Sequence, residues 1–179
     1  KEEEDRDEDL DYEFSDWYLR SEHDLTKKLN VDFKYQTLRK DYVADGSYDY
    51  HGFIGSNGIR YQLINDRERS VYFNLSLEHK EIDFLTLSDL SNVKNALSLK
   101  ATYRKKEKWK VSPWIKTAKK EYADPLEDYD NHELGISWEK EWRDKDITLG
   151  LEIATRFKDF QSKSDETLTW FNVSNSIRF

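Results

Sequence analysis

An alternation of apolar and polar residues with a period of two runs through this chain, from Leu10 almost to its last residue. Successive side chains of a β-strand point to opposite faces, so this period predicts strands with one apolar and one polar face. β-branched and aromatic residues concentrate at the apolar positions, and a helical period fits none of these segments better. The chain is therefore predicted to be all-β.

The breaks between alternating segments come in two lengths. Short polar turns are expected at 66–69, 105–108 and 143–146, whereas longer loops are expected at about 85–94, 119–131 and 159–166. Short and long connections in alternation are typical of an up-and-down antiparallel transmembrane β-barrel, with tight turns at one rim and long loops at the other.

The strand count depends on Gly55-Ser56-Asn57-Gly58, which matches a hairpin turn. With that turn we expect about ten strands, an even number, and both chain ends at the short-turn rim. Without it there are about nine, which would indicate part of a larger barrel. We favour about ten strands. The predicted strands are 8–22, 27–39, 46–54, 58–65, 70–84, 94–105, 108–119, 131–143, 146–158 and 167–179.

The composition predicts one domain, with an acidic tail at residues 1–9 and a single β-barrel domain at residues 10–179. Cys is absent, so disulfides and thiolate ligands are excluded, and no cofactor is expected. The net charge of -8 disfavours nucleic acid as a partner. No signal peptide is recognisable, which fits a mature protein or a fragment.

Alternation alone does not separate a membrane barrel from a soluble one. Most of the predicted strands reach the 9 to 11 residues that a tilted membrane strand needs, and aromatic residues cluster near strand ends, as in an interfacial girdle. Against the membrane stand the charged fraction of 37% and Pro113 in mid-strand, because a closed barrel has no edge to accommodate a proline. A soluble lipocalin-like β-barrel remains the alternative fold.

The final residues place a polar, a small, an apolar and an aromatic side chain at Asn172, Ser174, Ile177 and Phe179. This pattern resembles the C-terminal insertion signal of Gram-negative outer-membrane β-barrel proteins, with Ser174 where that signal usually has Gly. The resemblance implies a location in the bacterial outer membrane. The implied partners are outer-membrane lipid, lipopolysaccharide and the barrel-insertion machinery, while the oligomeric state stays open.

A second stretch, Ser56-Asn57-Gly58-Ile59-Arg60-Tyr61, resembles the Ser-Asn-Gly-x-Arg-Tyr stretch of the oligogalacturonate and sialate channel family of outer-membrane porins. The match is local and rich in turn residues. It implies a monomeric channel for acidic sugars with a basic lining, although this chain is shorter than those channels.

The polar positions supply candidates for such a lining. The basic residues expected to face the lumen and to contact a small anionic solute are Lys34, Arg60, Lys100, Arg104, Lys110, Lys116, Arg156 and Arg178. Four of them, from Lys100 to Lys116, would form a basic track on adjacent strands, opposite acids such as Glu133, Glu139 and Glu152. Such a transverse field guides anions through a pore. The alternative is a salt-bridged interior that packs a narrow barrel shut.

No enzyme or metal site is expected. His51 and Ser56 resemble part of the His-x-Ser-Asn-Gly motif of outer-membrane phospholipases, but their odd spacing places them on opposite strand faces, so lipid hydrolysis is only a minor alternative. His132 and Glu133 are adjacent and also point apart. The predicted function is an outer-membrane channel or porin for small anionic solutes. Two alternatives stay open: a non-conducting structural or adhesion barrel whose long loops bind a partner, and a soluble ligand-binding β-barrel.

Overall fold

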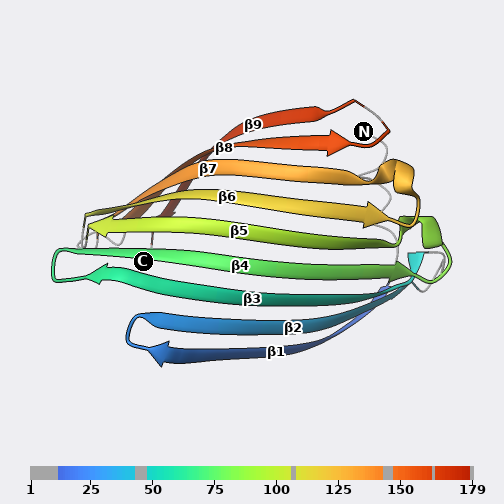
Figure 1. The fold of residues 1–179 in the computed structure, drawn as a ribbon, viewed down its shortest axis with the longest axis horizontal. Helices are drawn as coiled ribbons and strands as arrows, with labels where there is room; N and C mark the ends of the chain where they lie inside the picture. Colours follow the sequence, from blue (N-terminus) through green and yellow to red (C-terminus); the bar gives the residue numbers. More distant parts are fainter. Residues whose placement is uncertain (1–11, 43–47, 106–107, 143–146, 163, 178–179) are drawn as a thin grey trace.

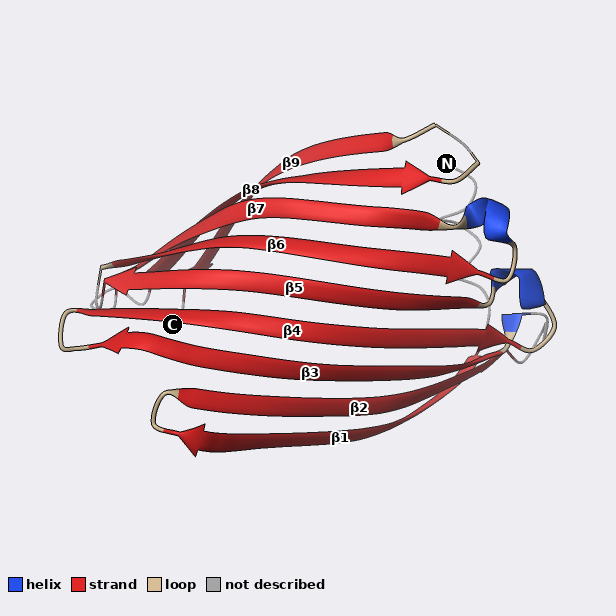
Figure 2. Ribbon diagram, in the orientation of Figure 1, coloured by secondary structure: helices blue, strands red, loops and turns tan. Residues whose placement is uncertain are grey.

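The computed structural model describes residues 12–42, 48–105, 108–142, 147–162 and 164–177. They form a single nine-stranded antiparallel sheet in which each strand pairs with the next one along the chain (Figure 1, Figure 2). The strands are β1 (Tyr12–Thr26), β2 (Leu29–Tyr42), β3 (Tyr50–Asn65), β4 (Arg69–Phe84), β5 (Asn92–Lys105), β6 (Trp109–Tyr122), β7 (Tyr129–Trp142), β8 (Ile147–Phe160) and β9 (Glu166–Ile177).

The all-β antiparallel meander is confirmed, but no hydrogen bonds between β1 and β9 close the sheet into a barrel. Two short 3-10 helices, η2 (Ser88–Leu90) and η3 (Pro125–Glu127), lie in the connections after β4 and β6. The acidic tail predicted at residues 1–9 lies outside the described residues.

The predicted hairpin at Gly55–Gly58 is wrong, and with it the count of ten strands. β3 runs through this segment and stays in continuous register with β2 on one side and β4 on the other. Gly58 provides space: a Cβ built there would overlap the carboxylate of Asp32 on β2. The neighbouring strand therefore covers this glycine with a side chain, and the chain does not turn.

The expected alternation of connections is otherwise confirmed. Residues 27–28, 66–68, 106–108 and 143–146 join strands at one rim, and residues 43–49, 85–91, 123–128 and 161–165 join them at the other. β9 ends at the short-turn rim, as predicted. β1 instead begins at the long-loop rim, where Tyr12 pairs with Tyr42, because the odd strand count reverses its expected direction.

The two faces of the sheet differ in enclosure. All the fully buried strand residues project from the polar face, and they are mostly small: Gly58, Ser70, Ile82, Ala96, Thr102, Ser112, Ala118, Asn131 and Ala154. In Figure 1, the ends of β8 and β9 on the side of the short turns curve behind the neighbouring strands. The sheet therefore curls around its polar face, which we call the concave face, and the apolar face is the convex one.

Pro113 lies inside the sheet, where sequence reasoning did not expect a proline to be tolerated. Its ladder with β7 is continuous, since Pro113 pairs with Ile136. On the other side, the ladder of β6 with β5 lacks pairs between Lys100 and Tyr103, although the register is the same before and after this gap. The proline, which has no backbone N–H, thus lies at a gap of two residue pairs in one ladder, and the sheet continues across this gap.

Candidate functional site

Large apolar side chains cover the convex face across all nine strands. They are well exposed to solvent: Ile115 is 54% and Phe171 66% accessible. We call this set the apolar belt, and it comprises Trp17, Leu19, Phe33, Tyr35, Ile59, Tyr61, Phe73, Leu75, Leu77, Leu97, Leu99, Ile115, Leu134, Ile136, Ile153, Phe171 and Val173. The accessible surface of 13041 Å² exceeds the value of about 9,000 Å² that surface scaling gives for a compact chain of this mass.

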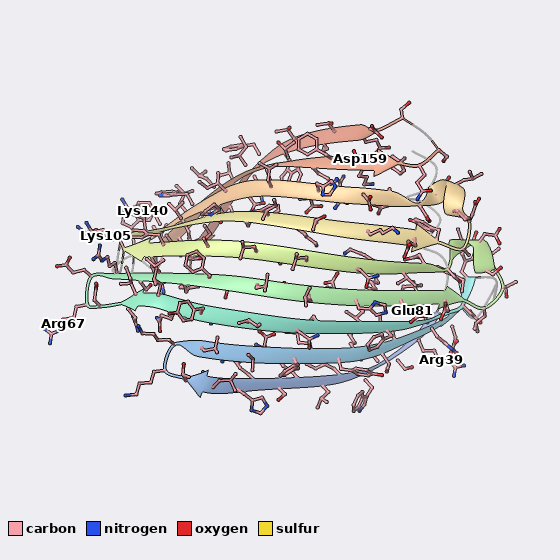
Figure 3. The ribbon with its side chains drawn as sticks, viewed as in Figure 1. Arg39, Arg67, Glu81, Lys105, Lys140 and Asp159 are labelled. Carbon is pink, nitrogen blue, oxygen red and sulfur yellow. The ribbon has the colours of Figure 1, made fainter. Side chains whose placement is uncertain are left out.

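The apolar belt is bounded by charges at its two margins. On β5, no Asp, Glu, Lys or Arg projects from the convex face between Val93 and Tyr103, and the same holds over the middle of the other described strands. Charged residues resume towards the rims. Figure 3 shows Lys105 and Lys140 near the short-turn rim, and Arg39, Glu81 and Asp159 near the long-loop rim. In β5 the interval measures about 34 Å along the strand.

Aromatic rings mark both margins of the belt. Towards the long-loop rim, the ring centroids of Trp17 and Tyr35 lie 5.8 Å apart, and those of Tyr35 and Phe53 lie 4.7 Å apart. Towards the short-turn rim, Tyr103 and Trp109 lie 5.2 Å apart. Tryptophan and tyrosine at the edges of an apolar zone are typical of a membrane–water interface.

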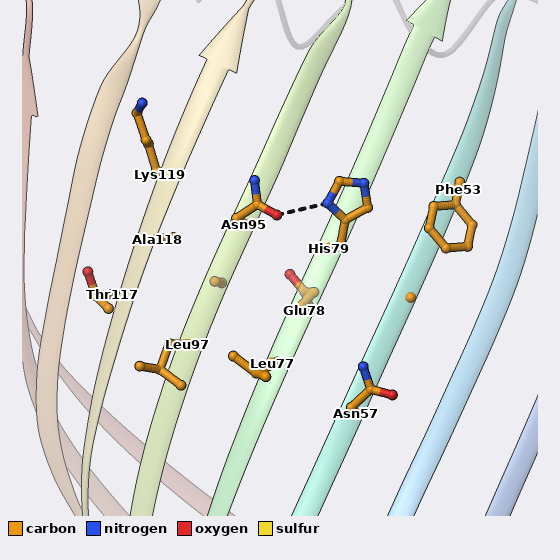
Figure 4. A pocket seen from close by; sticks show the side chains of 12 residues that line it. Phe53, Asn57, Leu77, Glu78, His79, Asn95, Leu97, Thr117, Ala118 and Lys119 are labelled. Atoms are coloured by element: carbon orange, nitrogen blue, oxygen red, sulfur yellow. Dashed lines mark hydrogen bonds between the residues drawn. The ribbon is translucent and has the colours of Figure 1, made fainter.

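A shallow depression of about 600 Å³ interrupts the convex face at the long-loop margin of the belt (Figure 4). Leu77 and Leu97 line its apolar part, and Gly55, which has no side chain, leaves space between them and Phe53. At its polar end Nδ1 of His79 lies 2.8 Å from Oδ1 of Asn95. This hydrogen bond satisfies two polar side chains at the boundary between the apolar and charged zones.

The concave face carries every described member of the predicted lumen lining. The register places Lys34, Arg60, Lys100, Arg104, Lys110, Lys116 and Arg156 on this one face. Arg178 lies outside the described residues. Over β3–β6 this face is strongly basic. Among the described residues of these four strands, Glu78 is the one acidic side chain on the face.

Acidic residues on β7, the predicted Glu139 and also Glu141, partly neutralise the basic residues. Nζ of Lys110 lies 2.8 Å from Oε2 of Glu139, and the guanidinium of Arg104 lies 3.6 Å from Glu141. Glu133 lies directly between Lys116 and Arg156 in the register. Lys34, Lys100, Lys116 and Arg156 form no ion pair within 4.0 Å with any residue that the structure describes. Some basic side chains of the concave face are thus ion-paired, and others form no ion pair with a described residue.

A polar depression of about 440 Å³ lies on the concave face near the short-turn rim. Arg60 donates from Nε to Oδ1 of Asn74 at 2.9 Å, and its guanidinium lies 5.6 Å from the ring centre of Tyr72. On the opposite wall, Asn30 donates to Glu22 and Asp24, both at 3.1 Å. The depression thus presents an arginine on one side and carboxylates on the other.

Sequence reasoning missed a second basic group, at the long-loop end of the same face. Lys80 on β4 pairs with Lys94 on β5, and Lys94 pairs in turn with Lys120 on β6. We call these three residues the lysine row. The signal that could have revealed it is the register of the two hairpins, because the spacing of each lysine from its turn places the three opposite one another.

The structure also locates residues of the other predicted sites. Asn172 and Ser174 of the C-terminal signal project from the concave face of β9, opposite Glu152 and Gly150, while Phe179 lies outside the described residues and Ile177 ends the strand. His51 and Ser56 lie on opposite faces of β3, as their spacing predicts.

His132 contacts the hydroxyl of Thr117 at 3.0 Å on the convex face, whereas Glu133 faces the concave side. In the described part of the chain, no three His, Asp or Glu side chains gather as a metal site.

No protein-family model, curated protein or solved structure matches this chain. Among the described residues, no helix is both long enough and apolar enough to cross a membrane.

Proposed function

We propose that this sheet forms the wall of an outer-membrane β-barrel whose concave face lines a channel for small anionic solutes. The observation that carries the proposal is the convex face, which bears exposed apolar side chains on every strand and charges only towards the rims. With a barrel tilt of about 40°, the interval on β5 corresponds to roughly 26 Å along the membrane normal. That height is close to the apolar band of about 25 Å in outer-membrane barrels.

The directions of the two edge strands limit how this sheet could close into a barrel. In a nine-stranded meander β1 and β9 run in the same direction, so direct closure would require a parallel seam. If a second copy in the same orientation packed edge to edge with the first, its β1 would again lie parallel to β9 of the first copy. A fully antiparallel barrel therefore needs an odd number of strands from outside β1–β9. Unpaired edge groups are costly in hydrocarbon, which favours such closure.

The basic concave face supports anions as the solutes. Over β3–β6 positive side chains outnumber the negative ones, and several form no ion pair with a described residue. Fixed charges of one sign in a confined, hydrated passage attract counter-ions and repel co-ions. The resemblances of the C-terminal residues and of Ser56–Tyr61 point to the same location and solute class.

The first test is membrane association. We expect the protein to require detergent for extraction and to migrate differently on gels before and after heating. A monomer that stays soluble without detergent would reject the proposal and favour the soluble ligand-binding β-barrel.

The second test is conduction. We expect the purified protein to give current in planar bilayers, with a reversal potential in a salt gradient that shows anion preference. Folded, inserted protein without current at any salt concentration would instead favour the non-conducting structural or adhesion barrel.

A further inference from the structure

The lysine row places three ammonium-bearing side chains directly opposite one another. Lys80, Lys94 and Lys120 are partners in the register of β4, β5 and β6 and project from the concave face near the long-loop rim. Adjacent strands lie about 4.8 Å apart, so the row extends over roughly 10 Å. Like charges directly opposite in a sheet are destabilising, so this arrangement costs stability.

The structure offsets that cost only in part. Lys94 donates from Nζ to Oε1 of Glu78 at 3.0 Å. Glu78 also lies in the electrostatic field of Lys80 and Lys116, so one carboxylate serves several ammonium groups. Lys80 and Lys120 form no ion pair within 4.0 Å with any residue in the described ranges.

Aromatic rings flank the row on the side of the long loops. Nζ of Lys120 lies 4.4 Å from the ring centre of Tyr122, and Nζ of Lys158 lies 4.8 Å from that of Tyr129. Tyr129 is itself the register partner of Lys120 on β7. Rings hold ammonium groups in place without neutralising them. The positive charge of the row therefore remains available to an anion.

We propose that Lys80, Lys94 and Lys120 bind a small multivalent oxyanion at the long-loop mouth of the concave face, an inference that rests on the proposed channel. Ammonium groups at one-strand spacing across three strands match a solute with several carboxylates or phosphates. A monovalent anion contacts one lysine at a time, so it gains less binding free energy. Lysine is a point charge with three donors, so the row accepts either oxyanion.

The site is tested by calorimetry on the full chain in detergent micelles at low ionic strength. The probes are citrate and tripolyphosphate as multivalent oxyanions, with acetate as the monovalent comparison. The variants are K80Q, K94Q and K120Q. The matched control is K119Q, which makes the same charge change on the convex face one residue away, where Lys119 pairs with Glu121 at 2.6 Å. Heat-modifiable migration confirms that each variant is folded.

We expect saturable binding of citrate or tripolyphosphate, tighter than that of acetate. Each substitution in the row should weaken binding roughly tenfold, which corresponds to 1.4 kcal/mol, while K119Q leaves it unchanged. The inference is overturned by absence of saturable binding, by equal affinity for acetate, or by equal weakening in K119Q. Binding without bilayer current would reject the channel and keep the site, whereas current without binding would reject the site alone.

Discussion

The hydroxyl groups of Thr102 on β5 and Ser112 on β6 lie 3.0 Å apart, beside the position where Pro113 interrupts the ladder between these strands. Both side chains are almost completely buried, at 1% and 0% exposure. The side-chain hydrogen bond therefore joins two strands in the part of the sheet where the backbone ladder is interrupted.

Because this hydrogen bond is buried, we expect the removal of one of its hydroxyl groups to lower the stability of the protein substantially. Thr102→Val preserves shape but leaves the Ser112 hydroxyl buried without its partner, so we expect the free energy of unfolding to fall by about 1–3 kcal/mol. Urea titration of the protein in vesicles measures it. The control is Gln36→Met, because the hydrogen bond that Gln36 donates to Asp16 at 3.1 Å is exposed on the concave face; there we expect less than about 0.5 kcal/mol. Equal losses in both variants would contradict this role.

Asp66 predicts a pH dependence for the β3–β4 turn. The backbone N–H groups of Arg69 and Glu68 donate to its Oδ1 at 2.8 and 2.9 Å, and these bonds lower the pKa of its carboxyl below the ordinary value. Because the folded-state pKa is depressed, the stabilisation is fully present above the unfolded-state pKa. It is lost as pH falls through the folded-state pKa.

The measurement for Asp66 is the unfolding midpoint as a function of pH, compared with that of Asp66→Asn. Asparagine keeps a neutral acceptor and removes the titration. We expect the difference between the two proteins to shrink in acid and to be constant at neutral pH. A difference that does not change with pH would show that ionisation of Asp66 has no part in holding the turn.

The proposed membrane exposure of the convex face predicts an asymmetry between neighbouring positions on β7. Ile136 projects from the convex face and is 45% exposed, so in water a lysine there would be tolerated. In a bilayer midplane it should cost about 2–4 kcal/mol and reduce folding into vesicles. Ser137→Lys, on the concave face opposite Glu152, is the control and should fold normally. Similar folding of both variants would argue against lipid contact at β7.

Lys100 predicts a change in ion selectivity. It is exposed on the concave face and forms no ion pair with a described residue, so its charge is free to act on a solute. Lys100→Glu should move the reversal potential towards cation preference. Lys105→Glu, on the convex side of the same strand, makes the same charge change outside the lining and should have little effect. A shift of equal size in both would mean that net charge, and not the lining, controls selectivity.

Much of the sheet could be predicted because its signals are local. The alternation around Leu75 and Leu99 identifies both strands and their apolar faces, and the polar turns at 66–68 and 106–108 separate neighbours. The segment at Gly55–Gly58 could not be read this way. Asn and Gly favour a turn, but a strand with closely packed neighbours uses the same residues for space, as Gly58 does under Asp32. Sequence alone does not show which neighbour covers a glycine.

The positions of the basic residues were likewise predictable only in part. Their assignment to one face follows from spacing, which placed Lys100, Arg104, Lys110 and Lys116 together correctly. The lysine row was not predicted, because the alignment of Lys80, Lys94 and Lys120 depends on the register of two hairpins, β4–β5 with its long connection and β5–β6 with its short one. A shift of one residue in either hairpin would separate them.

The order of residues alone therefore established the strands, their two faces and the alternation of short and long connections, because these depend on a period of two and on local turn chemistry. The tertiary structure decided the strand count, the accommodation of Pro113 and the direction of curl. It also decided which charges meet: Lys110 with Glu139, and Lys94 with Glu78 between two further lysines. These depend on register between strands, which is a property of contacts across the sheet and not of any one segment.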